Sequence, residues 1–237
     1  HHIRSTAQGC AALPGEETSL NWLPFDHVVP ILTYHFADAY LGRAAVQLPT
    51  DEVIADPLAW LRSLAAHRVT HSWSPNFGFK LAASALREGG LDAAAVREPL
   101  GDLSCVRRLV NAGEQVPAAG CDAFLSLTGL PSEVMQPAFG MAETATCMAY
   151  ASLYGGSDSS ALVLTESLAA PSLRLAPPSA AEPGARVSSF TCLGPPSPGV
   201  EMRIVAADAQ SGGRDPLQSG GYSLLRELQV GRLQIRG

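Results

Sequence analysis

The chain has 237 residues, a net charge of −6 and a single lysine, Lys80, and 46% of its residues are hydrophobic. This length fits one large domain or two subdomains with a substantial core. A nucleic-acid surface needs clustered cations to contact phosphates, so the negative net charge and the single lysine argue against one. No apolar run of about eighteen residues predicts a transmembrane helix and no charged start followed by an apolar segment marks a signal peptide, so we expect a cytoplasmic protein.

The first informative segment along the chain is Trp22-Leu-Pro-Phe-Asp-His27. Its aromatic and proline residues predict a strand that leads into a rigid turn at a cleft, which makes His27 a candidate functional residue. Asp26 precedes an apolar stretch that contains Pro30, a pattern typical of a helix N-cap. The alternative for His27 is an ordinary turn histidine.

The segments that follow alternate between apolar strands and alanine-rich helices up to about residue 154. We expect helices over residues 56–68, 77–87 and 117–127, and strands over residues 69–73, 106–110 and 133–138. This alternation predicts parallel α/β layering. His67 and His71 have the i, i+4 spacing of a metal-binding pair, but the first helix should end near Arg68 and place His71 in the next strand, which argues against such a pair.

Two of these strands run into a glycine turn. Gly113 follows the strand at 106–110, and Gly140 follows the strand at 133–138. Without a Cβ, these glycines let the backbone approach a flat base or a phosphate, and ligands of open α/β sheets gather at such strand ends. Glu143 follows at the start of a helix, where a carboxylate can bind Mg²⁺ together with substrate phosphates. The alternative is ordinary turn chemistry, with Glu143 stabilising the helix dipole.

The composition changes after residue 154. Residues 155–186 are rich in Ser, Ala and Pro and predict a loop, clearest at 176–184, whereas residues 187–205 and 228–235 are β-rich on either side of a turn-rich stretch at 208–221. The expected organisation is an α/β part at 1–154, a loop at 155–186 and a truncated, barrel-like β-rich part at 187–237. The five cysteines form no Cys-x-x-Cys pair, so we expect small buried hydrophobic residues rather than disulfides or a zinc site.

Five segments resemble motifs of the adenylate-forming superfamily, which includes acyl-CoA synthetases, fatty-acyl-AMP ligases and adenylation domains of nonribosomal peptide and polyketide synthases. In chain order they are Asn21-Trp-Leu-Pro-Phe-Asp-His27, Asn111-Ala-Gly-Glu-Gln115, Phe139-Gly-Met-Ala-Glu143, Leu193-Gly-Pro-Pro-Ser-Pro-Gly199 with Glu201-Met-Arg-Ile-Val205, and Gly231-Arg-Leu-Gln-Ile-Arg-Gly237. They are similar to the family's Pro-Leu-x-His, Gly-Glu, Tyr-Gly-x-Thr-Glu, Gly-x-Pro-x-Pro-Gly and Gly-Glu-Leu-x-x-x-Gly segments. The resemblance covers most of the chain and implies a fragment of the family's large domain.

The resemblance also implies roles for individual residues. Glu143 would bind Mg²⁺ as a catalytic residue, and His27 would lie beside the channel for the acyl group and the pantetheine arm. The residues implied to contact ATP are Asn111, Ala112, Gly113, Glu114, Phe139, Gly140, Met141, Ala142 and Thr144. The residues implied to line the acyl pocket are Trp73, Asn76 and Phe77, although Trp and Phe are as often core residues.

The chain departs from the family's pattern in two ways. Ala142 stands where the family usually has threonine, a substitution that favours fatty-acyl-AMP ligases, and the hydroxyl of Thr144 would point about a third of a turn away at helical spacing. The chain also begins after the family's phosphate loop and ends before its ribose-binding aspartate and catalytic lysine, and Lys80 reads as a surface residue whose alkyl stem lies along apolar neighbours. We therefore expect this fragment alone to release no pyrophosphate.

The function implied by the resemblance is that of an acid-thiol or acyl-AMP ligase. It would use ATP and Mg²⁺ to activate a fatty or polyketide-starter acid as acyl-adenylate, and would then transfer the acyl group to CoA or to the phosphopantetheine thiol of an acyl or peptidyl carrier protein. Three alternatives stay open: an amino-acid adenylation domain, a non-catalytic remnant or pseudoenzyme of the same fold, and an unrelated nucleotide-binding enzyme with similar glycine turns.

Overall fold

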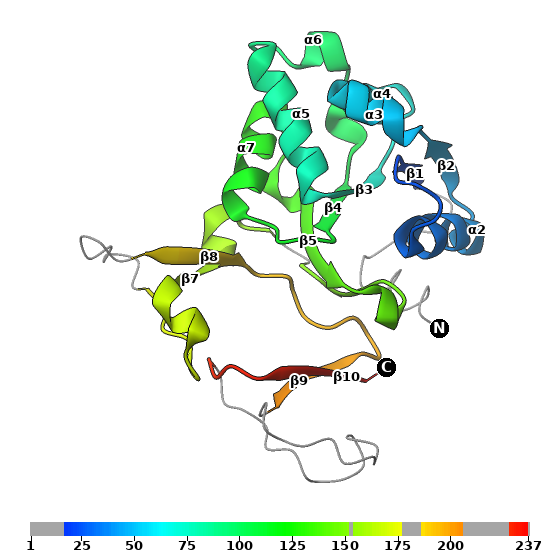
Figure 1. Ribbon diagram of the computed structural model, residues 1–237. Coiled ribbons are helices and arrows are strands. Elements are labelled where there is room, and N and C mark those ends of the chain that lie inside the picture. The colour runs from blue at the N-terminus through cyan, green and yellow to red at the C-terminus, as the bar shows by residue number, and fades with distance from the viewer. Residues whose placement is uncertain (1–16, 152–153, 177–185, 206–227, 237) are drawn as a thin grey trace. The chain divides into compact units, whose positions relative to one another are not determined.

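The structure, a computed structural model, describes residues 17–151, 154–176, 186–205 and 228–236. The chain divides into two compact units, residues 1–159 with 191–198, and residues 160–190 with 199–237. Figure 1 shows helices and a sheet in the first unit and short two-stranded ribbons in the second. The predicted α/β class with a layered first part is therefore confirmed.

A six-stranded sheet with the order β2-β1-β3-β4-β5-β6 forms the centre of the first unit. Its strands are β1 (Thr18–Asn21), β2 (Ala44–Gln47), β3 (His71–Pro75), β4 (Arg108–Ala112), β5 (Met135–Gly140) and β6 (Cys147–Tyr150). The first five strands are mutually parallel, and β6 is antiparallel to β5. The carboxyl ends of five strands therefore meet at one edge of the sheet.

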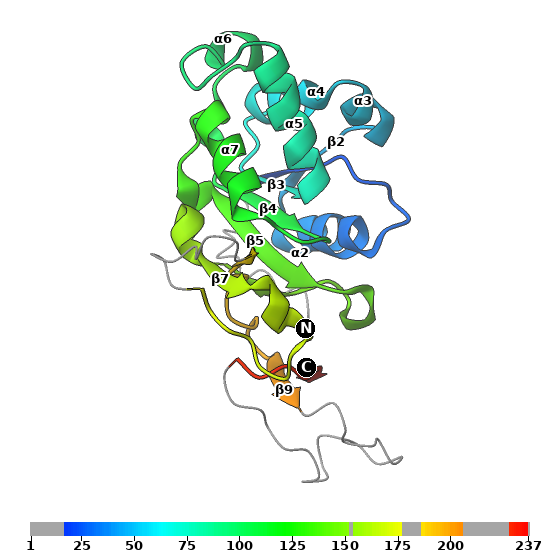
Figure 2. The same ribbon diagram turned by 60° about the vertical axis from the view of Figure 1, so that its left-hand side comes forward.

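Helices cover both faces of this sheet. The π-helix η1 (Pro30–Phe36) continues into α2 (Ala37–Leu41). The other α-helices are α3 (Thr50–Ala55), α4 (Pro57–Ala66), α5 (Asn76–Glu88), α6 (Arg97–Leu100) and α7 (Ala118–Thr128). Short 3₁₀ turns are η2 (Leu103–Cys105), η3 (Ser132–Val134), η4 (Ala142–Thr144) and η5 (Gly156–Ser159). Figure 2 shows α4, α5 and α7 together on one side of the sheet and α2 on the other. None of the helices in the described part of the chain combines the length and apolarity that a membrane span requires.

An aromatic cluster holds the three long helices together. Trp60 of α4, Phe79 of α5 and Phe124 of α7 are fully or almost fully buried. The ring centroid of Trp60 lies 5.2 Å from that of Phe79 and 6.2 Å from that of Phe124. Buried residues recur along α5 at Phe79, Ala82, Ala83 and Leu86, the spacing of an amphipathic helix, while Lys80 is exposed as predicted.

The predicted helices match α4, α5 and α7, but the predicted strands begin two residues too early. The structure starts β3 at His71, β4 at Arg108 and β5 at Met135, because hydrogen bonds to neighbouring strands, rather than the apolar run itself, decide where pairing begins and ends. The 3₁₀ turns η2 and η3 take up residues just before β4 and β5. This shift brings Ala112 and Gly140 into the last positions of their strands.

Two local predictions are wrong. Glu143 does not begin a longer helix, because it lies in the three-residue 3₁₀ turn η4, and Ala145, which follows η4 with a φ of +77°, turns the chain into β6. Asp26 was expected to cap the next helix, but the N-cap of η1 is Val29, with no side-chain cap. The N–H of Val29 itself donates to His27 Nδ1 at 3.2 Å.

The second unit contains two separate ribbons. β7 (Ser160–Leu164) pairs with β8 (Val187–Thr191), β9 (Glu201–Val205) pairs antiparallel with β10 (Arg232–Arg236), and η6 (Thr165–Ala169) follows β7. β7 and η6 lie inside the segment predicted as a loop, because the short apolar run Ala161-Leu-Val-Leu164 is hidden in a Ser- and Ala-rich composition. Most of the loop predicted at 176–184 and all of the turn-rich stretch at 208–221 lie outside the described residues.

The three cysteines whose side chains the structure describes differ in burial, whereas Cys10 lies outside the described residues and the side chain of Cys147 is not described. Cys121 is buried as predicted, Cys105 is half-buried, and Cys192 is exposed, so the expectation of a buried side chain is wrong there. Cys192 follows the end of β8, where the chain has left the sheet and packing no longer covers the thiol.

Candidate active site

A cavity of about 190 Å³ lies at the carboxyl ends of the parallel strands. Its walls come from the segment after β1, from β3, and from the turns after β4 and β5. The lining residues are His27, Val28, Val29, Trp73, Ala112, Gly113, Gly140, Met141, Ala142 and Thr146. Seven of these residues were predicted as site residues from the sequence, and the fold gathers them from four separate segments.

The strand order explains why a cavity forms here. The chain runs from β1 outward to β2 and then returns past β1 to β3, so the connections leave neighbouring strands in opposite directions. In open α/β sheets a crevice opens at such a reversal, beyond the carboxyl ends of the strands. The His27 segment and Trp73 lie on the two sides of this reversal, and the glycine turns of β4 and β5 extend the same edge.

Gly113 is the position where glycine is required by the backbone. Its φ is +84°, and a Cβ at this position would lie 3.5 Å from the ring of Trp73. A positive φ disfavours any residue with a side chain. The turn after β4 can therefore bring bare backbone against the cavity wall.

The second glycine turn is shaped by the hairpin between β5 and β6. Their pairing shifts register between Phe139 and Gly140, a bulge that re-aims the end of the strand. The backbone N–H of Met141 then donates to the carbonyl of Thr146 at 3.3 Å, with the left-handed Ala145 between them. This closed turn presents Met141 and Ala142 to the cavity.

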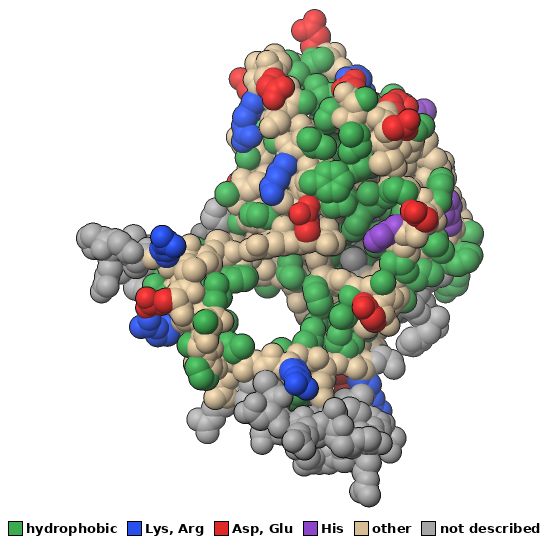
Figure 3. Space-filling view, viewed as in Figure 1, with side chains coloured by type: hydrophobic (Ala, Val, Ile, Leu, Met, Phe, Trp, Pro, Cys, Tyr) green, Lys and Arg blue, Asp and Glu red, His purple; other side chains and the backbone are tan. Residues whose placement is uncertain are grey.

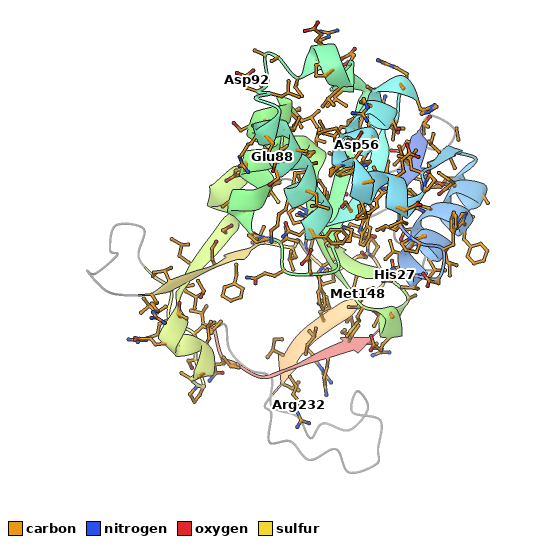
Figure 4. All side chains as sticks on the ribbon, turned by 45° about the horizontal axis from the view of Figure 1, so that its top comes forward. His27, Asp56, Glu88, Asp92, Met148 and Arg232 are labelled. Carbon is orange, nitrogen blue, oxygen red and sulfur yellow. The ribbon has the colours of Figure 1, made fainter. Side chains whose placement is uncertain are left out.

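His27 contributes an imidazole to the cavity wall. Its ring stacks on Trp73 with centroids 6.5 Å apart and an interplanar angle of 28°. Because Nδ1 accepts the N–H of Val29, the neutral ring carries its proton on Nε2. His27 is exposed. Figure 4 shows it far from Glu88, the last residue of α5. The imidazole can thus donate a hydrogen bond to a bound ligand.

The buried amides Asn111 and Asn76 lie behind the cavity rather than on its wall. Asn111 is 0% exposed and Asn76 is 1% exposed. The Asn111 Nδ2 donates to Asn76 Oδ1 at 3.5 Å and to Cys121 Sγ at 3.6 Å. These side chains tie the end of β4 to the start of α5 and α7, which is a supporting position.

Glu114 and Phe77 contact each other instead of the cavity. The Glu114 Oε1 accepts the backbone N–H of Phe77 at 2.7 Å. The Phe77 ring, 41% exposed, packs edge-on against Trp22 with centroids 5.9 Å apart. Neither residue lines the cavity that the structure forms, although both were predicted as site residues.

The remaining predicted residues border the second glycine turn. Phe139 is half-buried in β5, and Glu143 is exposed, one residue beyond the lining residue Ala142. The Thr144 hydroxyl donates to the carbonyl of Met141 at 3.0 Å, so it stabilises the turn. Within the described residues no cluster of three or more His, Cys, Asp or Glu side chains could hold a metal ion by itself.

Sequence reasoning missed three lining residues, Val28, Val29 and Thr146. Val28 and Val29 follow His27 directly, so the histidine was the available signal for them. Thr146 is 2% exposed and closes the β5–β6 turn. Its signal was the short polar stretch between two apolar runs, typical of a hairpin, which the sequence prediction replaced with a helix start.

Figure 3 shows a broad field of hydrophobic side chains on the displayed face of the first unit, with scattered acidic, basic and histidine side chains. Among the described residues that line the cavity, none has a carboxylate, a lysine or an arginine. The cavity lining therefore combines apolar side chains with polar groups, namely backbone amides, the His27 imidazole and the Thr146 hydroxyl, a mixture typical of small-molecule sites.

Comparison with known proteins supports a relation over nearly the whole chain. A family model described as AMP-binding enzyme matches residues 1–232. Aspulvinone E synthetase of Aspergillus terreus is 34% identical over 135 residues, which are 56% of this chain and 14% of that protein. Atromentin synthetase of Paxillus involutus is 30% identical over 253 aligned residues, covering 100% of this chain and 22% of that protein. The chain thus spans a minor part of these relatives.

Solved structures have the same fold. The adenylation domain of a keto acid-selecting nonribosomal peptide synthetase module, bound to keto acyl adenylate, matches with a TM-score of 0.80 and 30% identity, over 100% of this chain and 41% of that chain. Fatty acyl-adenylate ligases from E. coli and L. pneumophila match with a TM-score of 0.80 at 22% identity, over 100% of this chain and 39% of that chain. The second likeness concerns the fold alone.

Proposed function

Because the chain belongs to the family of AMP-binding enzymes, we propose that its cavity is part of the active site of an ATP-dependent ligase that activates a carboxylic acid. In the first step a carboxylate oxygen bonds to the α-phosphorus of ATP, and the bond to the leaving pyrophosphate breaks. In the second step a thiol attacks the acyl carbon, and AMP leaves. The observation that carries this proposal is the meeting of both glycine turns at one cavity beyond the parallel strands.

The nucleotide would lie against the glycine turns. Gly113 and Gly140 bring backbone close to a flat base, while Ala112, Met141 and Ala142 supply small or flexible apolar surface. The glycine turns would be held in position by residues outside the cavity lining, namely Asn111, Glu114, Phe139 and Thr144. Ala142 offers no hydroxyl to a phosphate, so backbone amides would provide the polar contacts on this side.

Glu143 fits the donor set that Mg²⁺ prefers with nucleotides. Mg²⁺ keeps several waters and binds through one or two carboxylates together with substrate phosphates. The Glu143 carboxylate is exposed and adjacent to a cavity-lining residue, so it can reach a hydrated ion without a cage of protein ligands. When bound, Mg²⁺ would offset phosphate charge.

The acid would lie between His27, Val28, Val29 and Trp73. An amino acid carries an α-ammonium group, which is costly to desolvate without a carboxylate partner. Because the described lining contains no carboxylate, an acid without an ammonium group fits better, such as a fatty or a keto acid. The structural relative that is 30% identical is a keto acid-selecting domain, which favours a keto acid.

His27 would serve the acid side of the reaction. Its Nε2–H can donate to a keto or carboxyl oxygen, and its exposed position allows the ring to swing when the thiol of CoA or of a carrier-protein phosphopantetheine arm enters. The choice of acceptor, a carrier-protein partner and a cytoplasmic location remain predictions.

Pyrophosphate exchange on the complete reading frame tests the proposal. The panel contains fatty, aryl, keto and amino acids, and compares wild type with Glu143→Ala and with Glu133→Ala, an exposed glutamate in η3. We expect exchange with one acid class, lost about 10²-fold or more in Glu143→Ala and kept in Glu133→Ala. Exchange with amino acids alone would contradict the assigned acid class. No exchange from an intact frame would favour the non-catalytic remnant.

A further inference from the structure

The carboxylate of Glu114 caps a helix that begins on another segment. α5 starts after Pro75, and its N-cap residue makes no side-chain hydrogen bond to the first turn. Glu114, 37 residues further along the chain, accepts the N–H of Phe77 in that turn at 2.7 Å. The first N–H groups of a helix lack partners within the helix and carry partial positive charge, so a carboxylate is a strong acceptor there.

This hydrogen bond connects the walls of the cavity. Glu114 directly follows Gly113, whose backbone lies against the Trp73 ring. Phe77 packs its ring on Trp22, which follows β1. The Glu114–Phe77 hydrogen bond and the Phe77–Trp22 ring contact together join the segments that follow β1, β3 and β4.

The direction of the Glu114 carboxylate also suits a nucleotide. A carboxylate on the wall of the cavity would repel phosphates through the low-dielectric surroundings. At the amino end of α5 its charge is offset by the helix dipole. The chain thus removes a negative charge from the lining while using it to hold the turn.

We propose that Glu114 is a positioning residue that holds the Ala112–Gly113 turn in the geometry that binds the nucleotide, without touching the nucleotide itself. This inference rests on the proposed function. It assigns to Glu114 a role different from the adenine contact that the sequence resemblance implies.

A second, buried tie lets the role be tested without unfolding the protein. Asn111 and Asn76 join the same two elements through their amides, independently of Glu114. Removing the exposed carboxylate contact should leave this tie in place. The Ala112–Gly113 turn would then lose its position, while β4 and α5 would stay joined through Asn111 and Asn76.

The experiment measures ATP binding by calorimetry, and the Michaelis constants for ATP and acid by pyrophosphate exchange, on the complete reading frame. The variants are Glu114→Ala, Glu114→Gln and the control Glu88→Ala, which removes a carboxylate from the opposite end of α5 (Figure 4). We expect Glu114→Ala to weaken ATP binding about tenfold while the Michaelis constant for the acid changes less than about twofold. Glu114→Gln keeps an oxygen acceptor for Phe77 and should restore most of the loss, and Glu88→Ala should behave as wild type.

Two results would overturn the positioning role. ATP affinity equal to wild type in folded Glu114→Ala would make the contact purely structural, even if the melting temperature fell. An equal loss in Glu114→Gln and Glu114→Ala would contradict a positioning role carried by the hydrogen bond to Phe77. Failure of wild type to bind ATP or exchange pyrophosphate is a separate outcome, because it would overturn the proposed function and with it this role.

Discussion

The two ends of the parallel strands in the first unit have opposite chemistry. At the carboxyl ends, the described residues that line the cavity include no carboxylate, lysine or arginine, and the cavity contains glycine turns and the exposed His27. At the amino ends, four ionisable side chains are buried, with Arg108 half-buried beside them: Glu17, Asp38, Arg43 and His71. The difference indicates that the sheet concentrates its buried ionisable side chains at one end, whereas the other end carries the cavity.

Arg43 is the centre of the buried group, which we call the amino-end network. Its guanidinium pairs with Glu17 at 3.1 Å and with Asp38 at 2.7 Å, and it donates to His71 Nδ1 at 3.2 Å. Ser19 donates to Asp38 at 2.6 Å, and Arg108 lies 3.6 Å from Glu17. Such a network gives little net stability against an apolar core, but losing one member leaves its partners buried and uncompensated.

The largest expected effect comes from breaking this network. Arg43→Ala would leave the carboxylates of Glu17 and Asp38 without their main partner, so we expect the free energy of unfolding to fall by about 3–5 kcal/mol. Urea unfolding measures it, with Arg62→Ala as control, because the Arg62–Asp56 pair is exposed and should contribute less than about 1 kcal/mol. Similar losses in both variants would contradict the contrast between a sealed amino end and an ordinary surface.

A smaller effect is expected at the cavity end from Gly113→Ala. The φ of +84° should lower stability by about 1–2 kcal/mol. Gly90→Ala is a matched control, because Gly90 has a φ of +65° and nothing within 4 Å of an added Cβ. Both variants should lose similar stability, but only Gly113→Ala should weaken ATP binding. Weaker binding in Gly90→Ala as well would show that backbone strain, not the cavity wall, is responsible.

The smallest effect is a pH dependence that belongs to the amino-end network. Complete burial, with Arg108 and Arg43 nearby, lowers the pKa of His71 well below its usual range. The unfolded chain therefore binds more protons below pH 6.5, and stability falls as pH drops from about 6.5 to 5.5, by at most about 1.4 kcal/mol per pH unit. Burial raises the pKa of Asp38 above its usual 3.8. The effect of Asp38 on stability therefore has the opposite sign to that of His71, because its contribution to stability is lost as the pH rises above 3.8.

Urea unfolding at pH 7.5, 6.5 and 5.5 checks this prediction. His71→Gln should remove most of the slope between pH 6.5 and 5.5, while His67→Gln, at an exposed position after α4, should keep it. The pH dependence is set by the groups that face His71, which are Glu17, Asp38, Arg43, Arg108 and the stacked ring of Tyr34. A wild-type slope in His71→Gln would mean that another group carries the titration.

Helix positions and the candidate cavity were partly readable in advance for a physical reason. The apolar spacing in α4, α5 and α7 is a property of consecutive residues, and so is the Asp56 cap, whose carboxylate accepts the N–H of Leu58 at 3.1 Å. The glycines of the two turns are also local signals. The match of motifs to a family then indicated which turns belong to one site.

The sequence by itself determined the alternation of strands and helices, the glycine turns at Gly113 and Gly140, and the apolar character of the surface near His27. Only the tertiary structure decided where each strand ends, which partner Glu114 takes, and that Thr146 rather than Glu143 lines the cavity. Strand ends and side-chain partners depend on residues far apart in the chain, brought together by packing. Local patterns cannot encode those distances, and for that reason the amino-end network had no signature in the sequence.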